Sequence, residues 1–112
     1  MFLLNPSKLL RTDLRSSHQY ISEQLEAPKA ADNLIDEAMR IIDYISETPY
    51  TRPLVNDAHL ASLGIRSIKV KNYILFYNVE EDKDRVNAIR FLYNKRDWIN
   101  ILKESDLNEI LQ

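Results

Sequence analysis

The chain contains no cysteine, a single glycine and two histidines among its 112 residues. Without cysteine the protein forms no disulfide bond and uses no thiol chemistry, which fits a reducing compartment and favours a cytoplasmic location. Because only two histidines are present, we expect no zinc or other metal site, and we expect no cofactor. No apolar run approaches the roughly 18 residues that cross a bilayer, so we expect no membrane partner.

The charge of the chain is small but uneven. The formal net charge is −2 and the pI is about 5.7, while the length suits one compact domain covering residues 1–112. Residues 64–103 carry nine Lys and Arg against five Asp and Glu, whereas residues 1–63 carry six against nine. This basic excess predicts that residues 64–103 meet an anionic partner, although ordinary scatter of surface charge also accounts for it.

Two proline-bounded segments predict an antiparallel helical hairpin. A short edge strand at Met1–Leu4 precedes it. Asn5 and Pro6 are typical of a helix start, and we predict the first helix over about residues 7–26. Pro28 opens a second helix, which ends at about residue 47 because the residue before Pro49 avoids the α region. The second helix has the strongest periodicity in the chain, and we expect it to bury Leu34, Ile35, Ala38, Ile41, Ile42 and Ile45.

Three runs rich in Ile, Val, Phe and Tyr follow and predict strands. They are Ile65–Lys71, Tyr73–Glu80 and Val86–Tyr93. Lys71-Asn72 predicts a two-residue turn in which Asn72 takes a positive φ, and the charged Glu80–Arg85 segment predicts the second hairpin turn. The result is a three-stranded antiparallel meander with a short C-terminal helical tail. The fold class is therefore α+β, with the sheet covering the apolar faces of the hairpin.

These turns set a register for the meander that brings two arginines together. It pairs Arg66 with Tyr77, Tyr77 with Ala88, Leu75 with Arg90, and Tyr73 with Leu92. Arg66 and Arg90 then share one face of the sheet, although a slip of one residue would separate them. Two guanidinium groups in this position predict an anion site suited to phosphate. The alternative is that each arginine pairs with an acidic residue and covers apolar surface with its stem.

Four other residues carry local signals. Asp57 and His59 lie in the loop that we expect over residues 48–63, where a surface position or a turn-capping aspartate is more frequent than a catalytic pair. His18 lies beside the apolar stripe of the first helix, and we interpret it as a packing or boundary residue rather than a base. Gly64 is predicted to take a positive φ where the meander begins.

An ordered set of short motifs spans the meander. It consists of Gly64-Ile65-Arg66, Val70-Lys71-Asn72-Tyr73, Phe76-Tyr77, Ile89–Tyr93 and Lys95–Trp98. The set resembles the RelE/ParE superfamily, the toxins of type II toxin–antitoxin pairs, and the two predicted helices before it agree with the resemblance. The resemblance implies a single RelE/ParE-like toxin domain that arrests growth and has a cognate antitoxin as its partner.

One branch that the resemblance implies is enzymatic. RelE-type toxins are ribosome-dependent endoribonucleases that cleave messenger RNA. On this branch Arg66 and Arg90 would stabilise the charge of the phosphorane, and Tyr93 would stack on a base or share in proton transfer. The residues that would contact RNA or another target are Lys69, Lys71, Lys95 and Arg96.

The other branch acts by binding alone, since ParE-type toxins inhibit DNA gyrase. The run Arg96–Ile99 resembles this branch, and no histidine lies on the third strand of the meander. A pI of about 5.7 also suits a protein target better than ribosomal RNA. We therefore favour gyrase inhibition over messenger RNA cleavage. A third alternative is an inactive relative kept for pairing with an antitoxin.

The resemblance also implies that an antitoxin helix lies in a hydrophobic groove of the toxin. Trp98, Ile99 and Leu102 belong to an amphipathic end segment that would help to form or cover this groove. The alternative is that Trp98 closes the core of the sheet.

Overall fold

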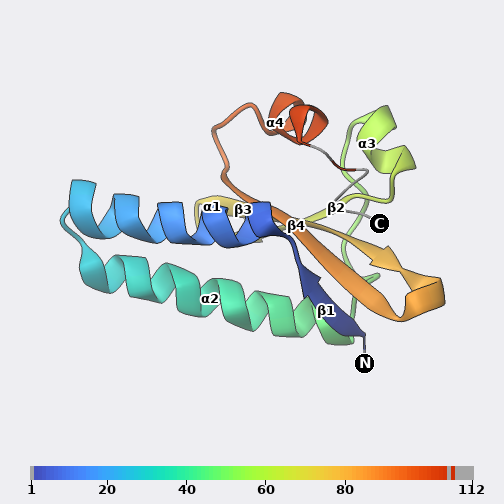
Figure 1. Cartoon of the computed structure of the whole chain (residues 1–112), viewed down its shortest axis with the longest axis horizontal. Helices are drawn as coiled ribbons and strands as arrows, with labels where there is room; N and C mark the ends of the chain where they lie inside the picture. Colours follow the sequence, from blue (N-terminus) through green and yellow to red (C-terminus); the bar gives the residue numbers. More distant parts are fainter. Residues whose placement is uncertain (1, 106, 108–112) are drawn as a thin grey trace.

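The computed structural model describes residues 2–105 and 107, and these residues form one four-stranded sheet with four α-helices. The helices are α1 (Lys8–Gln19), α2 (Pro28–Glu47), α3 (Ala58–Ser62) and α4 (Trp98–Glu104); the strands are β1 (Leu3–Pro6), β2 (Arg66–Val70), β3 (Tyr73–Glu80) and β4 (Arg85–Tyr93). The strand order is β1-β4-β3-β2, with β1 parallel to β4 and the other neighbours antiparallel (Figure 1). The predicted α+β fold is confirmed.

Helix α1 begins at Lys8, one residue after the predicted start at about residue 7, but its N-cap is not the one predicted. Ser7 is its N-cap, because the Ser7 hydroxyl accepts a hydrogen bond from the Leu10 amide at 2.9 Å. Asn5 and Pro6, which we expected to start the helix, instead end β1. Nδ2 of Asn5 donates to Oδ1 of Asn87 on the neighbouring strand at 2.7 Å, so the side chain that would have capped the helix is used by the sheet.

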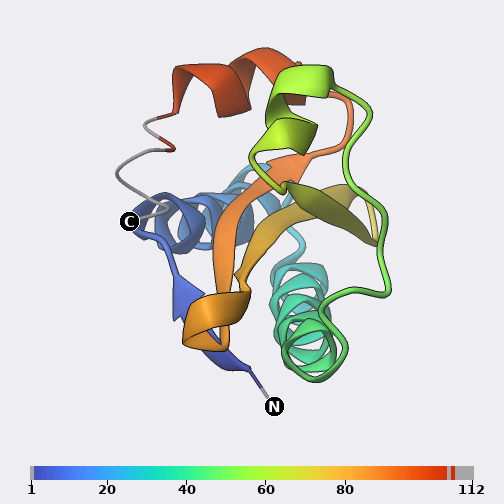
Figure 2. The same ribbon diagram turned by 90° about the vertical axis from the view of Figure 1, so that its right-hand side faces the viewer.

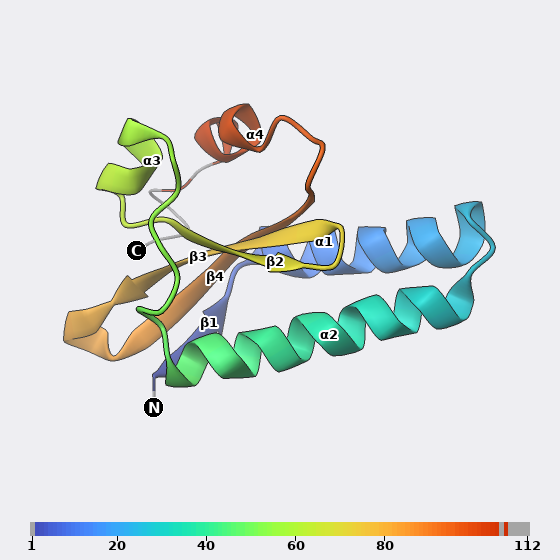
Figure 3. The ribbon, with the colours of Figure 1, turned by 180° about the vertical axis from the view of Figure 1, so that it is seen from behind.

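The helical hairpin has the predicted form. A π-helical turn, Tyr20–Gln24, continues α1 toward the connection, and Pro28 occupies the first turn of α2. The two helices run side by side under one face of the sheet (Figures 1 and 3). Helix α2 ends at Glu47, two residues before Pro49, as the restriction on the residue before proline indicates.

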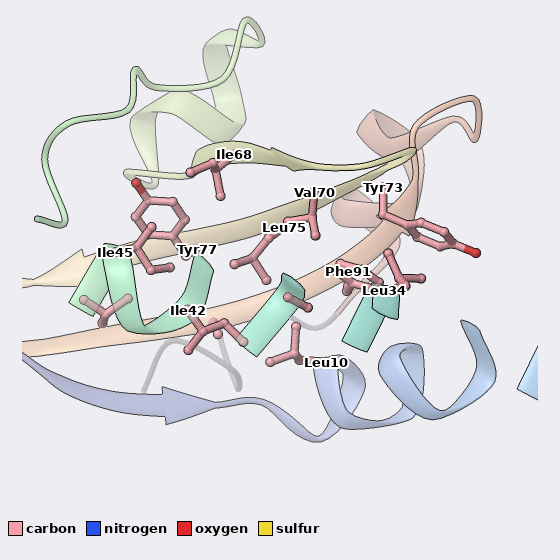
Figure 4. Close-up of a cluster of buried hydrophobic side chains, with 13 residues drawn as sticks. Leu10, Leu34, Ile42, Ile45, Ile68, Val70, Tyr73, Leu75, Tyr77 and Phe91 are labelled. Atoms are coloured by element: carbon pink, nitrogen blue, oxygen red, sulfur yellow. The ribbon is translucent and has the colours of Figure 1, made fainter. Parts of the chain in front are cut away.

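The apolar face of α2 packs on the sheet. Its buried apolar residues are Ala31, Leu34, Ala38, Ile42 and Ile45. All of them except Ala31 join α1 and the near face of the sheet in one cluster, shown in Figure 4. Ile41 packs against this cluster from its border. Ile35 is only partly buried, contrary to prediction, because it faces the groove between the helices beside Leu14 and His18.

A second apolar cluster covers the opposite face of the sheet, under α3 and α4 (Figure 2). Its buried residues are Val55, Leu60, Ile65, Phe76, Ile89, Leu92, Leu102 and Leu107. Helix α3 lies where we expected only a loop. It begins because Asp57 accepts a hydrogen bond from the Leu60 amide at 3.1 Å, which confirms the capping interpretation of Asp57.

Positive φ values mark the turns of the sheet. Gly64 takes a φ of 78°, as predicted. In the turn between β2 and β3, Lys71 rather than Asn72 takes the positive φ, of 54°. A 3-10 turn, Glu81–Lys83, connects β3 to β4 and ends on Asp84 with a φ of 46°.

The register of the meander departs from the prediction within β4. Pairing of β2 with β3, and of β3 with β4 as far as Ala88, is as predicted. A bulge then adds one residue to β4, Ile89, and shifts each later pair by one. The observed pairs are Phe76–Arg90, Leu75–Phe91, Ile74–Leu92 and Tyr73–Tyr93. The predicted pairs of Leu75 with Arg90 and of Tyr73 with Leu92 are therefore wrong.

The bulge also separates the two arginines. Arg90 now pairs with Phe76, which belongs to the cluster under α4, whereas Arg66 pairs with Tyr77, which belongs to the cluster on α2. The prediction that Arg66 and Arg90 share a face and form an anion site is wrong. Strand β1 ends opposite Ala88, so the edge of β4 that faces β1 has no neighbouring strand after Ala88. The bulge at Ile89 therefore interrupts no pairing between β4 and β1.

Candidate functional site

Arg90 forms an ion pair with Asp13 of α1. Its Nε donates to Asp13 Oδ2 at 2.7 Å and its Nη2 donates to Oδ1 at 2.9 Å. The Phe91 amide donates to the same carboxylate at 3.0 Å, and Nη1 of Arg90 donates to Ser105 Oγ at 2.8 Å. The side chains of Arg90 and Asp13 are only 13% and 11% exposed. Asp13 therefore neutralises this guanidinium, which is the alternative that we had weighed against a phosphate site.

Arg66 has a different environment at the start of β2. Its Cζ lies 5.4 Å from the centre of the Tyr50 ring, a cation–π contact, and its Nη1 donates to the carbonyl of Arg52. Tyr93 lies at the far end of β4. The structure therefore does not bring together the three residues predicted to be catalytic, Arg66, Arg90 and Tyr93.

Tyr93 and Arg96 instead line one cleft of about 570 Å³. One wall comes from α1 and its π-helical turn, and the other comes from the β2–β3 turn and the end of β4. The lining residues are Asp13, Ser16, Ser17, Tyr20, Ile21, Leu25, Asn72, Tyr73, Tyr93 and Arg96. We call this hollow the α1 cleft. Three other concavities of the described chain measure about 210, 490 and 480 Å³.

Aromatic rings and one cation set the chemistry of the α1 cleft. The Tyr73 ring stacks on Phe91 with centroids 4.8 Å apart and meets Tyr93 edge-on at 5.6 Å. Asp13 is already paired with Arg90, and Arg96 forms no ion pair with the residues that the structure describes. The α1 cleft is therefore suited to an apolar or aromatic group that lies beside a negative charge.

Three of the predicted target-binding residues lie near this end of the sheet. Lys71 is in the β2–β3 turn, and Lys95 and Arg96 follow β4. The Asn94 amide donates to the Asn72 carbonyl at 2.9 Å, which ties the two segments together. All three cations are exposed, and we call them the basic tip. Lys69 is exposed on β2, opposite Ile74 and so on the α4 side of the sheet.

Trp98, Ile99 and Leu102 all lie on α4. Leu102 is fully buried, and the Trp98 ring packs against Phe76 with centroids 5.3 Å apart. Trp98 and Ile99 are partly buried against the second cluster. Trp98 therefore closes the core on this face, as the alternative reading proposed, and Trp98 and Ile99 keep some surface for a partner.

Two features of the site were missed because their partners are distant in the sequence. Asp13 is 77 positions from Arg90 in the sequence. The only sign of its role in the sequence is that an acidic residue lies beside the apolar stripe of α1. Ser16 of α1 and Tyr20 of the π-helical turn line the α1 cleft, and no sequence signal singled them out. His18 lies at the boundary with α2 as interpreted, with Nε2 at 2.7 Å from Oδ1 of Asp32.

Residues 2–105 and 107 contain no group of three acidic or histidine side chains that could hold a metal ion. None of the helices formed by these residues is both long enough and apolar enough to cross a membrane.

Comparison with known proteins gives a family and a fold. Residues 4–98 match the model of a family described as the ParE toxin of the type II toxin–antitoxin system parDE. No curated protein sequence matches the chain.

Three solved structures that resemble this chain come from toxin–antitoxin systems. The chromosomal ParDE toxin–antitoxin system from P. aeruginosa gives a TM-score of 0.66 at 11% identity, covering 83% of this chain and 96% of that one. The RelBE2 toxin–antitoxin complex from Mycobacterium tuberculosis gives 0.57 at 17%, covering 82% and 96%. The intact E. coli RelBE complex gives 0.51 at 19%, covering 86% and 100%. At these identities the likeness establishes the fold.

Proposed function

The chain belongs to the ParE toxin family of type II toxin–antitoxin systems, and from that premise we propose that it arrests growth by binding and inhibiting DNA gyrase. The resemblance to the RelE/ParE superfamily is thereby confirmed, while the target is our proposal. Gyrase works in the cytoplasm, so the proposal includes a cytoplasmic location.

The ion pair between Arg90 and Asp13 is the observation that favours binding over RNA cleavage. Cleavage by a 2′-OH requires cations at the phosphorane and a group that moves the proton, all within reach of one phosphate. Arg90 is neutralised by Asp13, and Arg66 lies on the other side of the sheet. A binding toxin needs no such convergence.

The α1 cleft and the basic tip are the surface that we assign to the target. Together they offer exposed aromatic area at Tyr93 and Tyr20 with cations at Lys95 and Arg96. Tyrosine and arginine are the side chains on which protein interfaces most often depend for affinity. The basic tip is also the observation that supports the second candidate, an endoribonuclease of the RelE type that binds RNA through Lys71, Lys95 and Arg96.

We further propose a cognate antitoxin as the physiological partner. The similar solved structures from M. tuberculosis and E. coli are toxin–antitoxin complexes. On this chain we assign the exposed parts of Trp98 and Ile99 on α4 to the antitoxin. Leu102 of the same helix is buried in the second cluster and holds α4 on the sheet.

Supercoiling and cleavage assays with the purified chain test the proposal. We expect the chain to inhibit supercoiling of relaxed plasmid by gyrase and to leave messenger RNA intact on translating ribosomes. The double variant Lys95→Gln and Arg96→Gln should raise the concentration for half inhibition by about tenfold or more, as the loss of an interface hot spot does. The control with the same charge change, Lys29→Gln and Arg11→Gln on exposed helical surface, should inhibit normally. Ribosome-dependent cuts without any effect on supercoiling would reject gyrase as the target.

A further inference from the structure

A second surface cluster lies at the start of β2, whereas the α1 cleft lies at the other end of that strand. Tyr44 comes from α2, Tyr50 and Arg52 from the segment after α2, and Arg66 begins β2. We call these four residues the tyrosine–arginine patch. Tyr44 and Tyr50 are 46% and 49% exposed, and neither lines the α1 cleft.

The patch is held in place by contacts with the fold. The Arg66 guanidinium lies 5.4 Å from the centre of the Tyr50 ring and donates to the Arg52 carbonyl, so β2 holds the segment that follows α2 in place. The buried Tyr77 donates from its hydroxyl to the Pro49 carbonyl at 3.2 Å, which anchors the start of the same segment. A partner would therefore meet side chains that need little ordering on binding, which lowers the entropic cost of association.

Two guanidinium groups belong to this patch, and Arg66 contacts the backbone of Arg52 through its Nη1. Burial raises the pKa of Tyr77, and the positive charges of Arg66 and Arg52 act in the opposite direction because they favour the phenolate. The pKa of Tyr44 is lowered by hydrogen bonds with Thr51 and Thr48, and the charge of Arg52 adds to this effect. Neither arginine forms an ion pair within the part of the chain that the structure describes.

We propose that the tyrosine–arginine patch binds an acidic segment of a protein partner, with carboxylates on Arg52 and Arg66 and an apolar side chain against the tyrosine rings. A guanidinium holds a carboxylate through two parallel hydrogen bonds, and the contact with the Arg52 carbonyl occupies only part of the Arg66 donor set. Leu54, which is 45% exposed and forms an isolated antiparallel β-bridge with Arg66, adds apolar surface at the border of the patch.

Neighbouring charges favour a protein segment over a nucleic acid. Glu47 lies one turn after Tyr44 on α2, Asp43 precedes Tyr44, and both carboxylates belong to exposed residues. A nucleic-acid strand carries a phosphate at every nucleotide, so a strand crossing the patch would bring negative charge against this part of α2. A peptide can place its carboxylates at the two arginines alone.

Fluorescence anisotropy with the full chain and three labelled probes tests the proposal. The probes are a Glu–Leu peptide whose only charged side chains are two Glu, the matched peptide with Gln in their place, and a single-stranded RNA of equal length. We expect the Glu–Leu peptide to bind at least about tenfold more tightly than either other probe, because it pairs both guanidiniums with carboxylates, sets leucine against the tyrosine rings and brings no further negative charge toward Asp43 and Glu47. Arg52→Gln should weaken binding by about tenfold, since it removes one charge-assisted pair.

Matched variants separate this site from general charge attraction. Arg11→Gln removes the same charge from an exposed position of α1 and should leave binding unchanged. Arg66→Lys keeps the charge but loses the planar fork, and it should also weaken binding. The fold uses Arg52 through its backbone carbonyl, so Arg52→Gln is expected to melt like the parent protein. The proposal is overturned if the Glu–Leu peptide does not bind, if Arg11→Gln weakens it as much as Arg52→Gln, or if RNA binds more tightly.

Discussion

Replacing Asp13 with alanine is predicted to destabilise the protein strongly, because it leaves the largely buried guanidinium of Arg90 without a counter-charge. Arg90 would keep one contact, to Ser105 Oγ at 2.8 Å, and the Phe91 amide would lose its acceptor where β1 no longer covers β4. Breaking a buried ion pair from one side costs about 3–5 kcal/mol. For a domain of this size such a loss lowers Tm by on the order of 10–20 °C.

A double-mutant cycle measures this interaction directly. Urea unfolding would be followed for Asp13→Ala, for Arg90→Met and for the double variant, with Asp36→Ala on the exposed side of α2 as the matched control. We expect the double variant to be more stable than the sum of the single losses by about 2 kcal/mol, because no charge is then left unpaired. Losses that simply add, or a loss for Asp13→Ala as small as that for Asp36→Ala, would refute the reasoning.

Three further outcomes follow from single residues. Hydrogen bonds from Asn87 and Arg85 lower the pKa of Glu80 to about 2, below the value of this carboxyl in the unfolded chain. The stability that Glu80 contributes is therefore present above about pH 4.3 and is lost as the pH falls toward 2. Urea midpoints between pH 6 and pH 2 should therefore fall less in Glu80→Gln than in the parent, and equal slopes would contradict this. Gly64→Ala should cost about 1–2 kcal/mol in urea unfolding because its φ is 78°, although an added Cβ would meet no atom within 4 Å; an unchanged midpoint would contradict the strain argument. Tyr93→Ala should weaken growth arrest while keeping Tm within a few degrees, since the residue is 38% exposed, and full toxicity would remove Tyr93 from the target surface.

The helical hairpin was predictable because its signal is local. Leu34, Ala38, Ile42 and Ile45 recur at helical spacing, and prolines mark both ends of α2. Helix α3 was missed because its five residues are too few to show a period. Its only signal was Asp57 three residues before Leu60. This is the spacing between an N-cap side chain and the backbone amide that donates a hydrogen bond to it.

The bulge in β4 was not predictable from the same reasoning, and the candidate site changed with it. Both faces of the sheet are covered at this strand, so β4 is buried along most of its length and its apolar residues show no strict alternation that an extra residue would interrupt. The register therefore rested on the hairpin turns alone. One extra residue, Ile89, was enough to take Arg90 out of the predicted pair with Leu75, and its guanidinium pairs with Asp13 of α1 instead. Tyr93 and Arg96 still came together because both lie past the bulge, at the mouth of the α1 cleft.

Inducing the toxin alone in growing cells tests its proposed action on gyrase most directly, with plasmid topology and the 5′ ends of messenger RNA read from the same culture. We expect plasmids to lose negative supercoiling within minutes, before growth slows, with no new messenger RNA ends at codon boundaries. Cells that express the Lys95→Gln and Arg96→Gln variant should keep normal topology and grow. New RNA ends that appear while plasmid topology stays unchanged would contradict gyrase inhibition and favour RNA cleavage.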